Sequence, residues 1–179
     1  RFFGGWGFAA EDAMSRNPAE VGYRKGVPMG GDLYRAPVGE APTFLVAAMK
    51  DPYGGNLDRI QIIKGWMDAN GETHEKVHDV TWSGDRTPRA DGKLPPVGST
   101  VDVQNATWTN TIGAAELIAV WKDPEFDPEQ HALYYARVIE IPTPRWTAYD
   151  QVRFGVKMPD EVPMVLQERA YTSPIWYTP

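Results

Sequence analysis

The sequence predicts a mainly β fold, an antiparallel β-sandwich of the immunoglobulin or fibronectin kind with long loops and at most one or two short helices. Three observations lead to this prediction. Apolar or alternating runs of four to ten residues recur along the chain and are separated by turn-forming residues. The 16 Pro and 17 Gly leave little room for long helices. Aromatic residues make up 12% of the chain, which favours a β-rich core.

The central strands follow from hydrophobic patterning and turn signals. Pro42–Lys50 is apolar on both faces, as expected for a buried strand, and Arg59–Met67 begins with clean alternation. Asn70-Gly71 is a strong hairpin signal, which makes Thr73–Trp82 the expected partner strand. His131–Ile141 is apolar on both faces, so we expect a strand in the centre of a sheet.

The remaining segments are less regular. Thr100–Thr109 alternates as a strand does, and Val165–Tyr177 is expected to be extended with a break at Ser173-Pro174. Gly113–Trp121 is compatible with helix or strand, because Ala, Glu and Leu favour helix among neighbouring strands. Ala9–Arg16 is the one other short helix we expect, in a region (9–40) that otherwise reads as loop. These segments amount to about seven strands without βαβ alternation, so we expect one domain over residues 1–179.

Composition and charge exclude several classes of function. The net charge is −6 and no run of five Lys or Arg occurs, so we expect no nucleic-acid partner. The longest apolar runs, such as Phe44–Met49, are too short to insert across a membrane. The absence of cysteine excludes disulfides and thiolate metal sites. Because the chain enters an apolar stretch directly after Arg1, we expect this start to be a strand cut from a longer protein, with targeting signals upstream.

One motif resembles a zinc-peptidase site. His74-Glu75-x-x-His78 spells H-E-x-x-H, which needs a helix so that both imidazoles share one face and bind one zinc ion. The motif here lies between a hairpin signal and Val80-Thr81-Trp82, which favours a strand. In a strand the two histidines would be roughly 13 Å apart, with Glu75 on the opposite face. We therefore expect two solvated imidazoles on an exposed strand. A zinc hydrolase that uses this motif is the second alternative function.

The other candidate site residues are aromatic. Trp66, Trp82 and Trp108 lie on three expected strands and, if exposed, would form a stacking platform for sugars. This makes a carbohydrate-binding module the first alternative function, although tryptophans buried in a sandwich core are commoner. His131 follows a turn and is expected at the surface. No further constellation of residues forms a catalytic site, and we expect no cofactor in this chain.

Several segments resemble the C-terminal part of a bacterial family known as domain of unknown function 3604. These segments are RFFGGW (1–6), VPMGGDL (27–33), DRIQIIKGW (58–66), KLPPVGSTVDV (93–103), YYARVIEIPTPRW (134–146) and QERAYTSPIWYTP (167–179). The resemblance covers the whole chain, and IPTPRW and QERAYTSPIWYTP are its most specific parts.

The resemblance implies a larger protein, in which an N-terminal part similar to PHP (polymerase and histidinol phosphatase) metallohydrolases binds two or three divalent metal ions. This chain would then be a non-catalytic domain that supports or caps the barrel, and its partner would be that catalytic part. The resemblance also implies a periplasmic or secreted protein. No catalytic residue transfers to this sequence. We expect Tyr171, Ile175 and Trp176 to contact the catalytic part, with an ordinary core strand as the alternative.

Overall fold

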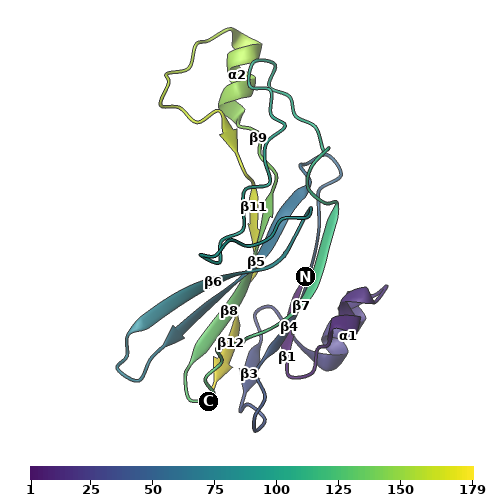
Figure 1. Ribbon diagram of the computed structural model, residues 1–179, viewed down its shortest axis with the longest axis vertical. Helices are drawn as coiled ribbons and strands as arrows, with labels where there is room; N and C mark the ends of the chain where they lie inside the picture. Colours follow the sequence, from purple (N-terminus) through teal and green to yellow (C-terminus); the bar gives the residue numbers. More distant parts are fainter.

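The computed structural model describes residues 1–179, which form two main β-sheets and a helical arm (Figure 1). The strands in chain order are β1 (Phe2–Gly5), β2 (Gly26–Pro28), β3 (Asp32–Tyr34), β4 (Thr43–Met49), β5 (Leu57–Met67), β6 (Thr73–Trp82), β7 (Glu116–Lys122), β8 (Ala132–Glu140), β9 (Thr143–Pro144), β10 (Val165–Leu166), β11 (Arg169–Tyr171) and β12 (Ile175–Thr178). The helices are the 3-10 helix η1 (Ala10–Met14), α1 (Pro18–Lys25) and α2 (Trp146–Phe154). The predicted mainly β fold is therefore confirmed.

The strands pair almost entirely antiparallel. One sheet has the order β2-β1-β4-β7, and the other has the order β3-β12-β8-β5-β6. The exception is the parallel pair formed by β12 and β3. Strand β11 pairs with β8 beyond β12, and the short strands β9 and β10 pair with each other. The prediction that residues 131–141 form a central strand is confirmed, because β8 has β5 on one side and β12 and β11 on the other.

The core lies between the two sheets. Alternation along β5 directs Ile60 and Ile62 inward, where both side chains are fully buried beside Tyr134 of β8. From the other sheet, the ring of Phe44 lies 4.5 Å from the ring of Tyr134, measured between centroids. Burial of one such large apolar side chain stabilises the fold by about 1.5–3 kcal/mol. This contact is one of the apolar links between the two sheets.

The hairpin predicted at Asn70-Gly71 is confirmed. Strands β5 and β6 pair from Arg59 and Trp82 to Met67 and Thr73, with one irregularity after Ile60. Gly71 has φ +79°, a conformation that glycine adopts without steric cost. Asp68 Oδ1 accepts hydrogen bonds from the N–H groups of residues 70 and 72, which closes the turn.

The strand predicted at Thr100–Thr109 is wrong. This segment is a loop with a single isolated bridge between Asp102 and Thr107. The carboxylate of Asp102 accepts hydrogen bonds from the N–H groups of Gln104 and Asn105, and Ala106 has φ +50°. Local side-chain bonding therefore replaces a strand ladder here.

Three further expectations need correction or refinement. The region 9–40, expected to be mainly loop, contains α1, β2 and β3 as well as η1. The ambiguous segment Gly113–Trp121 forms a strand, β7. The extended segment Val165–Tyr177 divides into β10, β11 and β12. Helix α2 was not predicted, although Gly155 supplies a left-handed C-cap with φ +64°.

No helix of the chain has the length and hydropathy required to cross a membrane.

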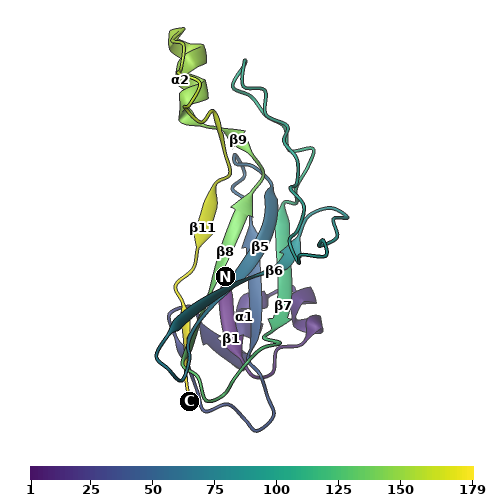
Figure 2. The same cartoon turned by 60° about the vertical axis from the view of Figure 1, so that its left-hand side comes forward.

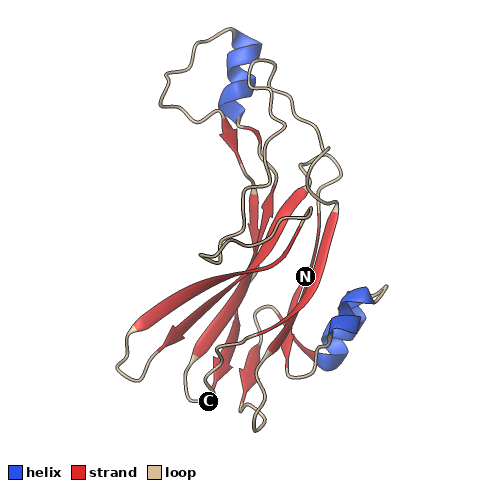
Figure 3. Cartoon of the chain, viewed as in Figure 1, coloured by secondary structure: helices blue, strands red, loops and turns tan.

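Helix α2 belongs to a projecting arm, residues 143–166, which comprises β9, α2, β10 and the loop between the helix and β10. Figure 3 shows α2 at one end of the molecule, away from α1, and Figure 2 shows the arm extending beyond the sheets. Two hydrogen bonds join the outgoing and returning segments within the arm. Thr147 Oγ1 donates to the carbonyl of Pro163 (2.7 Å), and Arg145 N–H donates to the carbonyl of Met164 (2.9 Å).

The sandwich interior also contains a buried ion pair. Lys64 Nζ lies 2.6 Å from Asp123 Oδ2, and their side chains are 5% and 0% exposed. The hydroxyl of Tyr134 donates to the same carboxylate oxygen at 2.7 Å, and Lys64 also donates to the carbonyl of Glu125. The other carboxylate oxygen of Asp123 accepts the N–H of Glu125. Every charge in this cluster is therefore paired, as burial requires.

A second buried carboxylate, Asp58 on β5, fastens a long loop to the sheet. Arg86 Nη2 lies 2.7 Å from Asp58 Oδ1, and Arg59 Nε lies 3.1 Å from Asp58 Oδ2. Arg86 also donates to the carbonyl of Pro95 at 2.9 Å. Because Arg86 contacts both strand and loop, this cluster orders residues 83–96 where no strand does so.

We expect the substitution Lys64→Met to lower the free energy of unfolding by about 3–5 kcal/mol, because it leaves the charge of Asp123 buried without a partner. The measurement is urea denaturation at pH 7. Lys76→Met is the matched control, since its partner Glu125 lies at the surface and the pair is exposed. Equal losses from the two substitutions would show that the buried pair has no special role.

Candidate functional site

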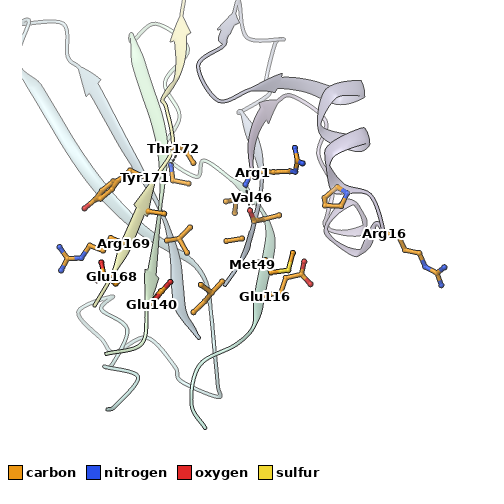
Figure 4. Close-up of a pocket in the computed structure, with 17 residues that line it drawn as sticks. Arg1, Arg16, Val46, Met49, Glu116, Glu140, Glu168, Arg169, Tyr171 and Thr172 are labelled. Carbon is orange, nitrogen blue, oxygen red and sulfur yellow. Dashed lines mark hydrogen bonds between the residues drawn. The ribbon is translucent and has the colours of Figure 1, made fainter. Parts of the chain in front are cut away.

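A cleft of about 610 Å³ opens at one side of the sandwich, and we call it the lateral cleft (Figure 4). Its apolar lining includes Val46 of β4, Leu57 of β5 and Ala136 of β8, so it opens onto the core. Strand β11 forms one wall, and the N-terminal end of β1 with β4 forms the other. Its size is within the range of ligand-binding clefts.

Two glutamates face each other on one wall of the cleft. Glu140, which ends β8, donates its N–H to the carbonyl of Glu168, which precedes β11, at 3.0 Å. Residues directly paired in this way place their side chains on the same face of the sheet. Burial raises the pKa of the Glu140 carboxyl, and the nearby charges of Glu168 and Asp51 raise it further. Neither glutamate forms an ion pair.

Two of the basic side chains that line the cleft point away from it. Figure 4 shows the side chains of Arg16 and Arg169 reaching away from the cleft. The terminal amino group of Arg1 donates to the carbonyl of Ala47 at 2.6 Å, and burial lowers its pKa. The cleft wall at β8 and β11 is therefore acidic, and sequence reasoning had not brought these residues together.

The H-E-x-x-H motif lies on β6, as expected. His74 and His78 are four residues apart on a strand, and alternation directs Glu75 to the opposite face. The geometry of a helical zinc site is absent. His74 instead stacks on Trp66, with ring centroids 5.2 Å apart, and its Nε2 lies 2.9 Å from Asp68 Oδ2.

His74, Asp68 and Glu72 bring three potential metal ligands within 4.8 Å of one another at the tip of the hairpin. These residue types suit a divalent ion such as zinc. Both oxygens of Asp68 are already used, by the turn N–H groups and by His74. The hydrogen bond to His74, followed by those to the turn, lowers the pKa of Asp68. The cluster is thus explained as the closure of an exposed turn.

The expectation of two solvated imidazoles is wrong for His78. Its ring packs against Trp121 of β7, with centroids 4.8 Å apart, and its Nε2 is buried without a hydrogen-bond partner. Burial lowers the pKa of His78 below its ordinary value near 6.5, and the positive charges of Lys76 and Lys64 act in the same direction. The carboxylates of Asp123 and Glu125 oppose this shift but do not outweigh it.

The three tryptophans of the expected sugar platform have separate environments. Trp66 is half-buried beneath Lys64, whose Nζ lies 5.4 Å from the ring centroid. Trp82 donates from Nε1 to the carbonyl of Arg86, under the long loop. Trp108 lies on no strand, in the loop that precedes β7. The structure therefore does not bring the three rings together as one platform.

The C-terminal aromatic residues divide between surface and core. Tyr171 and Trp176 are 57% and 47% exposed, whereas Ile175 is fully buried against the core. The expectation that Ile175 contacts another domain is therefore wrong, and its alternative, an ordinary core position, is correct. Tyr171 lies beside Tyr135 on the outer face of the sheet, with ring centroids 6.3 Å apart.

The arm carries exposed apolar side chains that the sequence reasoning did not single out. They are the large side chains of α2 and the residues just after it, each at least 42% exposed: Trp146, Tyr149, Val152, Phe154 and Val156. Of the α2 residues, only Thr147 and Ala148 are buried. The apolar residues of segment 146–156 can be recognised in the sequence, but only the projecting position of α2 shows that they are exposed to solvent.

The comparisons with known proteins identify a family. A family model described as "Protein of unknown function (DUF3604)" matches residues 1–179. No curated protein and no solved structure matches the chain.

We predict that the free energy of unfolding falls more steeply between pH 7.5 and pH 5 in the wild type than in His78→Gln. The lowered pKa of His78 means that the unfolded chain binds a proton more readily, so the contribution of His78 to stability is complete above pH 6.5 and is lost as the pH falls. Urea denaturation at several pH values measures this difference. His131→Gln, at an exposed position, should retain the wild-type slope. Parallel curves of unfolding free energy against pH for the wild type and His78→Gln would show that His78 does not cause the steeper fall.

Proposed function

The chain belongs to the DUF3604 family, and we propose that it is a non-catalytic accessory domain of a metal-dependent, PHP-like phosphoesterase. In this proposal the β-sandwich supports or caps a catalytic barrel that lies elsewhere in a longer polypeptide. The observation that carries the proposal is the projecting arm, whose exposed apolar side chains are suited to packing against another protein surface.

The burial pattern of α2 supports a docking role. A helix that packs only on its own domain buries its apolar stripe and exposes polar residues. In α2 the relation is reversed, since Thr147 and Ala148 face inward while Trp146 and Phe154 are 61% and 66% exposed. Burying a large apolar side chain in a contact contributes about 2 kcal/mol. Two such anchors favour an association between domains, and the outer-face residues Tyr171 and Trp176 offer a further contact.

The residues of this chain do not fit the metal centre of such an enzyme. A two-metal or three-metal site needs several His and Asp side chains converging on one point. The chain's three histidines do not converge on one point: His74 and His131 line one groove beside Trp66, whereas His78 packs against Trp121, and the only potential ligand cluster contains His74 alone of the three. The divalent metals are therefore proposed to bind in the catalytic part, and we derive no catalytic step for this domain.

We expect the 179-residue chain alone to hydrolyse neither p-nitrophenyl phosphate nor bis-p-nitrophenyl phosphate in the presence of Mn²⁺ or Zn²⁺. The full-length protein should hydrolyse at least one of them. Elemental analysis of the purified chain should find well under one equivalent of zinc. One equivalent that disappears in His78→Ala would instead favour the zinc-hydrolase alternative.

The arm contact is tested in the full-length protein with the pair of substitutions Trp146→Ala and Phe154→Ala. Loss of both anchors should separate the unfolding of the two domains, so that one calorimetric transition becomes two. The matched control is the pair Val38→Ala and Tyr53→Ala, at positions even more exposed but outside the arm. In the isolated chain both pairs should leave stability nearly unchanged. A single transition preserved in the arm variant would contradict the proposed contact.

A further inference from the structure

We propose that the lateral cleft is a second binding site, which takes an extended peptide segment carrying a Lys or Arg side chain. The peptide adds a strand to the free edge of β11 and places its cation between Glu140 and Glu168. This inference is independent of the proposed accessory function and does not involve the arm contact.

Strand β11 has one free edge. Glu140 N–H bonds to the carbonyl of Glu168, and Thr172 N–H bonds to the carbonyl of Ala136. In an antiparallel ladder hydrogen-bonded pairs alternate, so the main-chain groups of Arg169 and Tyr171 point away from β8. No other strand pairs with β11. Such an edge binds extended peptides by strand addition.

The charge of the cleft wall complements a basic side chain. Glu140 and Glu168 are direct cross-strand neighbours, an arrangement in which like charges repel. Their side chains share the face of the sheet that looks into the cleft, whereas Arg169 lies on the other face and reaches away (Figure 4). A lysine or arginine between the two carboxylates relieves this repulsion and forms charge-assisted hydrogen bonds.

An apolar lining lies beside the two carboxylates. Ala136, Val138 and Ala170 line the same wall, and Val46 and Ala48 line the opposite one. An added strand presents alternate side chains to the cleft, two residues apart. One of these positions meets the glutamates and the next meets the apolar lining. The occupant is therefore an extended segment in which a basic and an aliphatic residue alternate with residues that face solvent.

The test uses a fluorescein-labelled, C-terminally amidated peptide, Thr-Lys-Thr-Val-Thr-Lys-Thr, whose pattern is the same in either strand direction. Fluorescence polarisation with the 179-residue chain should give saturable binding. The same peptide with Glu in place of Lys should bind at least tenfold more weakly. Equal binding of the two peptides, or no saturable binding of the Lys peptide up to millimolar protein, would overturn the proposal.

Two variants of the chain locate the site. Glu140→Gln with Glu168→Gln should weaken binding of the Lys peptide at least tenfold. The control Glu72→Gln with Glu75→Gln removes the same charge from the β5–β6 hairpin and should change binding less than twofold. If the control pair weakens binding as much, the interaction follows net charge alone and the site assignment fails.

Strand addition is tested separately with Arg169→Pro. Proline removes an N–H that faces the open edge and leaves the bonds between β11 and β8 intact, as edge positions of this kind tolerate. Binding of the Lys peptide should fall at least fivefold, and Arg169→Ala should retain it. Because both substitutions remove the same charge, equal affinities for the two variants would overturn the strand-addition model. Circular dichroism of each variant confirms that the sheet is preserved.

Discussion

The structure depends on the interaction of Tyr134 with both sheets. Its ring packs on Phe44 across the sandwich, and its hydroxyl donates to Asp123, whose charge is balanced by Lys64. Apolar packing alone tolerates small shifts of one sheet over the other. A buried ion pair does not, because a misplaced partner leaves an unpaired charge in a medium of low polarity. The cluster therefore fixes the end of β7 relative to β5 and β8, and with it the placement of the two sheets.

Much of the sheet containing β5 and β8 was predictable from sequence because its signals are local. Alternation marks β5, a run that is apolar on both faces marks β8, and Asn70-Gly71 identifies β6 as the hairpin partner of β5. The errors arose where local patterning and local bonding disagree. Val101 and Val103 alternate with polar residues as in a strand, but the carboxylate of Asp102 bonds to nearby N–H groups and bends the chain. The arm helix was missed because its nine residues include aromatic and β-branched types with weak helix propensity.

The candidate sites were less predictable than the fold, because they depend on contacts between residues distant in sequence. Glu140 and Glu168 are ordinary glutamates until the register of β8 and β11 makes them neighbours. The H-E-x-x-H motif, by contrast, is conspicuous in the sequence, yet its strand conformation separates its two histidines. The same holds for His78, since only the approach of Trp121 from the other sheet reveals that its ring is partly buried. Hydrophobic patterning predicted the secondary structure, whereas the pairing and packing of the strands determined the environments of Glu140, Glu168 and His78.

The arm and the lateral cleft are connected through one feature of the topology. The chain leaves the sheet after Glu140, forms the arm and returns at Glu168, so the arm is the elaborated tip of the hairpin formed by β8 and β11. The two carboxylates thus stand at its base, where the paired strands give way to the projection. A contact that holds the arm also restrains the base of the hairpin, and a cation between the carboxylates restrains the same residues from the other side. If both proposals hold, the two contacts act on different parts of the same hairpin, the domain contact at its tip and the peptide at its base.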